Sequence, residues 1–273
     1  MNESFEARDV DGASDLLSIA PQRRTISGEL FPVMWQEPRM IVSYLHNFIF
    51  IKTKKTGGTA LEVALAPCCG PADIITPFGP SDEIRRSANG LIPRNFSSDP
   101  AAEQRLREAV QNRTRKIYRT AKRVGDFTSH MRAAEIKRRL SPDFWDGACK
   151  FTVERHPYEK AVSGAYYNYK EEHDGPLASH LDAFIRRGTY RTFEFYTIDG
   201  KPVVDEFLRH ETLAQDLKRL TNKLGFSVAE ELPRMKSRSR ADPRPAREIL
   251  SDEQKQIVRQ VCREEFELLG YEP

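Results

Sequence analysis

The feature that most constrains the fold is an apolar segment followed at once by a loop that contains lysines and glycines. Residues 48–51 have the sequence Phe-Ile-Phe-Ile, a continuous apolar run typical of a strand buried on both faces. The loop KTKKTGGT occupies residues 52–59, and residues 59–65 have helical character, which ends at Cys69-Gly70-Pro71. A strand, a glycine-containing loop and a helix in this order predict an α/β fold.

The loop has the composition of an anion-binding site. Gly57 and Gly58 let the backbone fold tightly and point successive N–H groups inward, and the helix that follows adds its positive N-terminal end. Lys55 supplies a full charge, while Thr56 and Thr59 can donate hydroxyl hydrogen bonds. The loop therefore suits a phosphate or sulfate group, although it is no Walker A motif, in which a glycine precedes the lysine. A solvent-exposed turn without a ligand is the alternative.

A second strand is predicted over residues 150–153, and it ends at the polar cluster of residues 154–157. A helix should follow, because Pro157 suits a helix entry and not a helix interior. Arg155 offers a planar fork of donors that matches a phosphate dianion. Ser163, eight residues later, can return to the same edge if the chain reverses at the proline. A surface ion pair is the alternative interpretation of the arginine.

One histidine stands out as a candidate general base. His130 precedes a predicted helical segment, and an imidazole has a pKa close to neutral, which suits proton transfer at pH 7. A purely structural role is the alternative for an isolated histidine. His173 and His180 lie in a polar stretch and are predicted to be surface loop residues.

The rest of the chain is expected to be mainly helical. Weak periodicity and several prolines predict an irregular arm over residues 1–40, followed by a single domain over residues 41–273. The expected helices cover approximately residues 101–124, 132–140, 158–169, 204–224 and 251–268.

A basic stretch covers residues 105–123, where eight basic residues accompany one acidic residue. It is either the solvated face of a helix or a patch for an anionic acceptor, such as an acidic glycan. The formal net charge of the whole chain is only +3, which by itself does not predict nucleic-acid binding.

Composition also excludes several classes of protein. No apolar run approaches the ~18 residues that a membrane helix needs, and the N-terminal residues lack the basic and apolar regions of an ordinary secretory signal. The four cysteines form neither a disulfide framework nor a paired metal-binding motif. We therefore expect a cytoplasmic protein without a membrane span and without a metal.

Together these motifs resemble those of the sulfotransferases that use 3′-phosphoadenosine-5′-phosphosulfate (PAPS). The likeness is closest to the carbohydrate O-sulfotransferases and their soluble bacterial relatives. It rests on Lys55-Thr56-Gly57-Gly58-Thr59, on Arg155-His156-Pro157 with Ser163, and on the segment that begins at His130. Softer family landmarks are residues 73–77, 205–213 and 270–271.

The resemblance implies a P-loop-NTPase-like three-layer fold, in which helices flank a central parallel sheet. It implies PAPS as the co-substrate, adenosine 3′,5′-bisphosphate as the product, and no metal. A late loop over residues 232–240 would close on the nucleotide, unless it is simply a solvated basic loop. The implied nucleotide-binding residues are Lys52, Lys55, Thr56, Gly57, Gly58, Thr59, Ala60, Arg155, Ser163, Lys236, Ser237 and Arg238.

The resemblance also implies a role for each main residue. Lys55 would neutralise charge on the leaving oxygen, and His130 would take the proton of the acceptor. Arg155 and Ser163 would hold the 3′-phosphate. Glu154 departs from the family pattern, which commonly has an apolar residue there, and its carboxylate could pair with the adjacent arginine and weaken this grip.

The expected activity is transfer of a sulfuryl group from PAPS to a hydroxyl or amine of a carbohydrate or other small acceptor. Two alternatives remain open. An ATP-dependent small-molecule kinase would need a Walker A pattern and an acidic Mg²⁺ ligand, and we identify neither. A non-catalytic binder of anionic polymers would use residues 105–123 and 234–247.

Overall fold

The computed structural model describes residues 40–78, 83, 86, 92–112, 125–127, 130–229, 232, 240 and 242–273. All of them belong to one compact unit, Trp35–Pro273. Apart from Met40, the expected N-terminal arm lies outside the described residues, and so do Lys236, Ser237 and Arg238.

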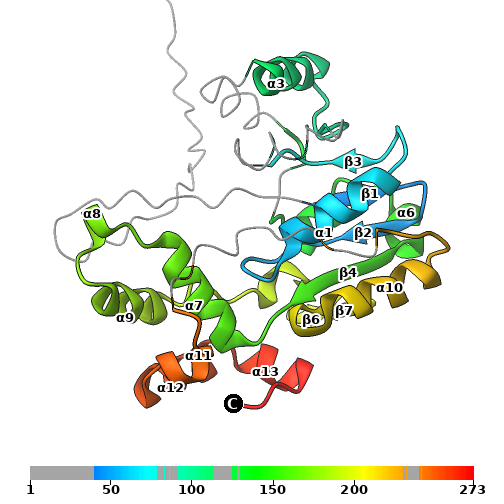
Figure 1. Cartoon of the computed structure of the whole chain (residues 1–273). Coiled ribbons are helices and arrows are strands. Elements are labelled where there is room, and N and C mark those ends of the chain that lie inside the picture. The colour runs from blue at the N-terminus through cyan, green and yellow to red at the C-terminus, as the bar shows by residue number, and fades with distance from the viewer. Residues whose placement is uncertain are drawn as a thin grey trace, which may run out of the picture. The chain divides into compact units, whose positions relative to one another are not determined.

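The described residues form an α/β structure (Figure 1). The strands are β1 (Ile41–Ser43), β2 (Phe48–Phe50), β3 (Ile74–Ile75), β4 (Cys149–Glu154), β5 (Thr197–Ile198), β6 (Lys201–Pro202) and β7 (Glu206–Arg209). The longer helices are α1 (Gly58–Leu65), α3 (Pro100–Gln111), α7 (Pro157–Asn168), α9 (Leu177–Arg187), α10 (Leu213–Lys223) and α12 (Asp252–Val261). The shorter helices are α5 (Ala133–Lys137), α6 (Pro142–Gly147), α8 (Glu171–Asp174), α11 (Ala246–Ile249) and α13 (Arg263–Leu269), with 3₁₀ turns η1 (Ala66–Cys68), η2 (Phe193–Phe195) and η3 (His210–Thr212).

The main sheet has five strands in the order β3-β1-β2-β4-β7. Strands β2, β4 and β7 are parallel, whereas β1 runs antiparallel to both of its neighbours. The expectation of a parallel sheet is therefore right for three strands and wrong for the other two. Only residues 44–47 join β1 to β2, and so short a connection forms a hairpin, because parallel neighbours need a crossover of a dozen or more residues.

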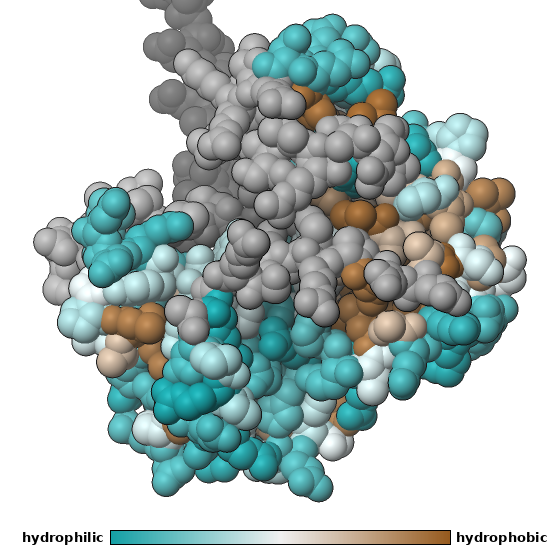
Figure 2. Space-filling model, in the orientation of Figure 1, coloured by the Kyte–Doolittle hydropathy of each residue, from teal (hydrophilic) through white to brown (hydrophobic). Residues whose placement is uncertain are grey.

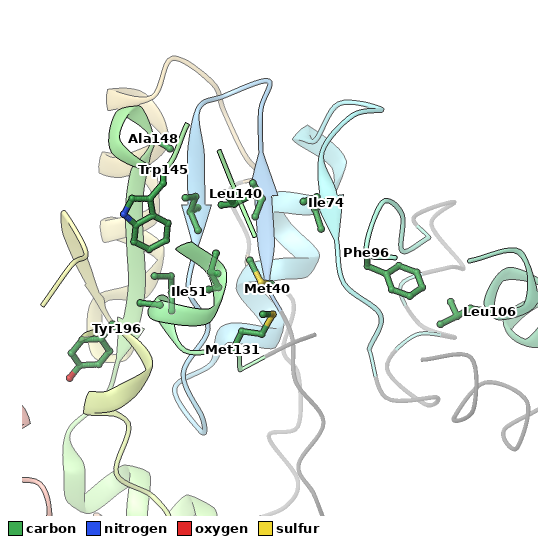
Figure 3. Close-up of a cluster of buried hydrophobic side chains, with 14 of the residues drawn as sticks. Met40, Ile51, Ile74, Phe96, Leu106, Met131, Leu140, Trp145, Ala148 and Tyr196 are labelled. Atoms are coloured by element: carbon green, nitrogen blue, oxygen red, sulfur yellow. The ribbon is translucent and has the colours of Figure 1, made fainter. Parts of the chain in front are cut away.

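Side chains of β2 alternate between two apolar layers, as expected for a strand buried on both faces. Phe48 and Phe50 join a cluster that includes α1 and α10. Ile49 and Ile51 point the other way, into a cluster that includes Trp145 of α6 (Figure 3). Helices therefore flank the sheet on both faces, and they hold β2 and its following loop in the middle of the structure.

A third apolar cluster lies outside these two layers and joins α7, α9, α11, α12 and α13. Figure 1 shows these helices grouped beyond the end of β4. Their outward surface and that of α3 are mostly hydrophilic in Figure 2. In the described part of the chain, no helix combines the length and the apolar character that crossing a membrane would require.

Several expected helices are confirmed with shifted ends, but the one expected over 204–224 is wrong in its first part. Residues 206–209 instead form β7, which pairs in parallel with β4, and the helix begins only at Leu213. Pairing with a neighbouring strand here overrides the local helical preference.

The prediction for His180 is also wrong. This residue lies in α9 and is only 7% exposed. Its Nε2 donates a hydrogen bond to the Ala165 carbonyl over 3.1 Å, and this main-chain acceptor explains why a polar ring can lie against the apolar cluster.

Candidate functional site

Three segments meet where the parallel strands end. The loop of residues 51–57 follows β2, Arg155 follows β4 and His210 follows β7. Because β2 pairs with β4 and β4 with β7, these carboxyl ends lie at one edge of the sheet. Open α/β sheets bind their ligands at this edge.

The loop bends through two residues in the left-handed region. Lys55 has φ 63° and Gly57 has φ 89°, and such a bend points neighbouring N–H groups toward one side of the loop. Gly57 also caps α1, whose first N–H groups lack the usual helical acceptors. The N–H of Ala60, expected to bind the anion, instead donates to the Gly57 carbonyl over 2.9 Å. The N–H groups that we still expect to face an anion are those of the residues before Ala60.

Lys52 is held inside the protein. Its side chain is 4% exposed, and its Nζ lies 2.6 Å from a Glu62 oxygen and 3.2 Å from the Thr59 hydroxyl. A Cβ on Gly58 would lie 2.9 Å from two of its side-chain carbons. Lys52 therefore ties the loop to α1, and glycine at position 58 gives its side chain room.

Lys55 points in another direction, toward α7. Its Nζ lies 3.6 Å from the centre of the Tyr167 ring, a cation–π contact. A Cβ on Gly164 would be 3.8 Å from its Cγ. Ser163, the residue before this glycine, is half-buried on the same helix, so the structure brings Lys55 and the expected Ser163 site to one helix.

Two threonines fasten the loop to β4. The buried Thr53 hydroxyl donates to the Val153 carbonyl, and its oxygen lies 2.9 Å from that of Thr56. Since the Thr53 proton goes to a carbonyl, Thr56 must donate to Thr53. The hydroxyl of Thr56 therefore makes its hydrogen bond within the protein. Of the groups of Thr56 expected to bind a ligand, the main-chain N–H remains.

His130 contacts the same loop from a distant part of the sequence. Its Nδ1 lies 3.0 Å from the Lys52 carbonyl, 78 residues away. A carbonyl only accepts, so Nδ1 carries the proton and, in the neutral ring, Nε2 holds the lone pair. His130 has φ 48°, an uncommon conformation that often marks functional sites. Its ring meets Phe195 edge-on, with centroids 5.9 Å apart.

His210 supports the other end of the loop; it lies within the sequence landmark of residues 205–213 but is not one of the predicted site residues. Its Nδ1 lies 3.0 Å from the Thr56 carbonyl. Burial, reinforced by the charge of Arg155, lowers its pKa below the ordinary value, so the ring is neutral at pH 7 and donates through Nδ1. Only the parallel pairing of β7 with β4 brings this histidine to the loop.

Arg155 is half-buried and only partly paired. Its Nη2 lies 3.1 Å from Glu159, but its buried Nε has no hydrogen-bond partner. Burial lowers the pKa of Arg155, against the opposing charges of Glu159 and Glu211, and the guanidinium stays charged at neutral pH. Glu159 also binds Arg240, at 2.7 Å, and the N–H of Ala246, at 2.6 Å. Arg240, absent from the expected set, thus belongs to this cluster.

Glu154 does not form the expected pair with the guanidinium of Arg155. Its fully buried carboxylate accepts from Lys160 at 2.9 Å, from the Thr192 hydroxyl at 2.6 Å and from the main-chain N–H of Arg155 at 3.3 Å. Burial raises the pKa of Glu154, despite the opposing charge of Lys160. The Glu154 carboxylate faces the buried ammonium of Lys160 instead of the guanidinium of Arg155. The guanidinium therefore stays available to other partners.

Little of the expected basic patch can be placed. Arg105 and Arg107 of α3 pair with Asp99 and Glu103, and residues 113–124 lie outside the described part of the chain. Among the residues that the structure describes, no group of three or more potential metal ligands occurs.

Around the loop the structure therefore gathers Lys55, His130, Arg155 and the helix of Ser163. These residues come from motifs that are far apart in the sequence. Comparisons of the chain with protein-family models, curated proteins and solved structures found no match. The case for a function consequently rests on the residues themselves.

Replacing Gly57 by alanine is expected to distort the site. A Cβ there would lie 2.7 Å from His210 Nδ1, and the positive φ of 89° adds about 1–2 kcal/mol of strain for an L-residue. We expect lost anion binding and a lower melting temperature. Gly225→Ala is the matched control, because Gly225 has φ 78° but nothing within 4 Å of an added Cβ. Equal effects of the two variants on anion binding would contradict the assigned loop geometry.

Proposed function

We propose that the chain is a PAPS-dependent sulfotransferase with a P-loop-NTPase-like fold, which transfers a sulfuryl group to a hydroxyl or amine of a carbohydrate or other small acceptor. The observation that carries the proposal is the convergence of separate motifs on one loop. Lys55 contacts α7, which begins just after Arg155, and His130 contacts the carbonyl of Lys52. A coincidental set of surface motifs would have no reason to meet.

The donors at this edge fit a phosphorylated nucleotide. The loop offers N–H groups at the start of α1 and carries the ammonium of Lys55, a combination that favours a phosphate or sulfate. Arg155 has a buried Nε without a protein partner, and an orphaned donor of this kind is costly unless a ligand satisfies it. These features support a second anionic group at Arg155, as the 3′-phosphate would supply.

The chemistry of the proposed reaction is direct displacement. PAPS supplies an activated sulfuryl group, whose bond to the phosphate oxygen breaks as the acceptor oxygen or nitrogen bonds to sulfur. His130 would take the acceptor's proton at Nε2, because Nδ1 is committed to the Lys52 carbonyl. The ammonium of Lys55 would turn from Tyr167 to the leaving oxygen and stabilise its charge. Positioning and electrostatics dominate such transfers.

Nucleotide selectivity tests the proposal directly. In calorimetry without metal, adenosine 3′,5′-bisphosphate should bind tighter than AMP, and Arg155→Ala should remove most of the difference. Hydrogen bonds to a charged group are worth about 1.5–3 kcal/mol, so the expected loss is roughly 10–100-fold. Arg219→Ala is the control, since Arg219 pairs with Glu206 on the surface.

Other outcomes would replace the proposal. A preference for ATP with Mg²⁺ would favour the small-molecule kinase. Failure to bind any of these nucleotides, combined with salt-dependent binding of anionic polymers, would favour the polymer binder.

A further inference from the structure

Glu159 is a carboxylate that two arginines share. It lies in the first turn of α7. Its Oε2 accepts a hydrogen bond from Arg155 Nη2 over 3.1 Å and another from Arg240 Nη1 over 2.7 Å. Its Oε1 accepts from the main-chain N–H of Ala246 over 2.6 Å. One side chain therefore joins the end of β4 to two positions that lie 81 and 87 residues further along the chain.

The carboxylate holds two like charges next to each other. Both arginine contacts use the same oxygen, so the two guanidiniums lie side by side, an arrangement that their mutual repulsion would oppose without the negative charge between them. Burial raises the pKa of Glu159, but the Ala246 N–H and the charges of Arg155 and Arg240 together lower it below the ordinary value. The carboxylate is therefore charged at neutral pH, and the cluster of these three side chains carries a net positive charge.

Both guanidiniums keep donors for a ligand. Within the described part of the chain, the buried Nε of Arg155 and that of Arg240 each lack a hydrogen-bond partner. The Nη2 of Arg240 donates to the Arg244 carbonyl. Because a guanidinium is planar and rigid, a contact at one Nη restricts the directions of its other N–H groups. Two buried charged donors without an acceptor are costly, and one anion beside both would remove this cost.

The cluster lies on the face of α7 that meets the loop after β2. Glu159, Ser163 and Tyr167 follow one another at intervals of four residues along this helix, which places them on one face. Lys55 contacts this face, since its Nζ lies 3.6 Å from the centre of the Tyr167 ring. The two arginines therefore stand at the N-terminal end of the same face, beyond the expected Ser163 site.

We infer that Glu159 is a positioning residue, which holds Arg155 and Arg240 together so that both guanidiniums bind the 3′-phosphate of the nucleotide. The inference rests on the proposed function. Glu159 itself would not touch the nucleotide. It acts by fixing two long side chains before the ligand binds, so that less of their freedom is lost on binding. A carboxylate that instead competes with the phosphate for these guanidiniums would have the opposite effect on affinity.

The test is the preference of the full chain for adenosine 3′,5′-bisphosphate over AMP, measured by calorimetry without metal. Glu159→Gln should lower this preference by about 3–10-fold, because the arginines remain but must be ordered on binding. The affinity for AMP should stay the same. Glu206→Gln is the matched control: Glu206 also bridges two cations, Arg219 at 2.9 Å and Lys223 at 2.7 Å, but at the start of β7, so the preference should not change.

Two further variants show that the carboxylate acts through the arginines. In the Arg155→Ala background, Glu159→Gln should lower the preference less than it does in the wild type, because one of its two partners is already absent. Arg240→Ala should lower the preference as well. This variant leaves the contact between Glu159 and Ala246 in place, so it tests the cluster even if Glu159→Gln does not fold.

The outcomes separate the inference from the proposed function. If the wild type does not prefer adenosine 3′,5′-bisphosphate to AMP, the proposed function itself fails. If it does, and Glu159→Gln shows an equal or a stronger preference, the positioning role is overturned and the sulfotransferase proposal stands. Equal losses of affinity for both nucleotides would assign Glu159 to the fold alone. A preference that Arg240→Ala leaves unchanged, or effects of Glu159→Gln and Arg155→Ala that simply multiply, would also overturn the inference.

Discussion

Lys55→Ala should lower sulfuryl transfer by about 10²–10³-fold, the cost of removing one group that stabilises transition-state charge in other enzymes. The ammonium lies over Tyr167, 3.6 Å from the ring centre, on the loop that is proposed to hold the donor. Lys52 cannot replace it, because Glu62 and Thr59 hold that ammonium on the α1 side. Initial rates at saturating PAPS with a responsive acceptor measure the loss.

The size of the loss must be separated from damage to the fold or to binding. Lys55→Ala should melt close to the wild type, since the hydrogen bonds that fasten the loop are made by Thr53, His130 and His210 and not by this half-buried lysine. Its affinity for adenosine 3′,5′-bisphosphate should change by only a few-fold, because the product lacks the bond that the lysine acts on. Near-normal turnover would refute the proposed role. A large loss of nucleotide affinity with unchanged turnover at saturation would make Lys55 a binding residue only.

The sequence predicted the centre of this site because its signals are local. An apolar run, a glycine-containing loop and a capped helix depend on neighbouring residues, and β2 and α1 lie within a residue of the expected positions. Strands β1 and β7 were missed for the opposite reason. They are short, and their pairing partners rather than their own patterns make them strands.

The surroundings of the site could not be predicted, because they depend on which segments meet. His210 reaches the loop only through the place of β7 beside β4, and Arg240 reaches Arg155 only through their shared carboxylate, Glu159. The three lysines of the loop look equivalent in the sequence, yet their partners differ. Lys52 pairs with Glu62, Lys54 lies near the Phe195 ring and Lys55 lies over the Tyr167 ring. In each case a contact between distant segments, and not a motif, assigns the role.

A second large effect, on stability, is expected in the buried charge cluster of Glu154, Lys160 and Glu265, which begins at the residue before Arg155. Lys160 lies 2.9 Å from both Glu154 and Glu265, and all three side chains are fully buried. The Thr192 hydroxyl bridges the two carboxyl groups at 2.6 and 3.0 Å. Since one ammonium serves two carboxylates, the cluster depends on this lysine.

Lys160→Met should therefore lower the free energy of unfolding by about 3–5 kcal/mol, as found when one partner of a buried ion pair is removed. The side chain fits the same space, so a cavity is not the cause. Both carboxyl groups lose their counter-charge, and their pKa values should rise. Chemical denaturation measures the effect, with Lys223→Met as the control, because its pair with Glu206 is exposed and contributes little.

The pH dependence distinguishes lost charge compensation from a general packing defect. In Lys160→Met the buried Glu154 and Glu265 should bind protons more tightly in the folded chain than in the unfolded one. Such groups favour the folded state at low pH, and this contribution is lost as the pH rises through their raised pKa values. In the wild type burial raises the pKa of Glu265, but the charge of Lys160 and the hydrogen bonds that the carboxylate accepts together more than offset it, so the pKa stays below the ordinary value. The destabilisation should consequently be larger at about pH 8 than at about pH 5. A loss of the same size at both pH values would mean that packing, and not charge, makes this lysine necessary.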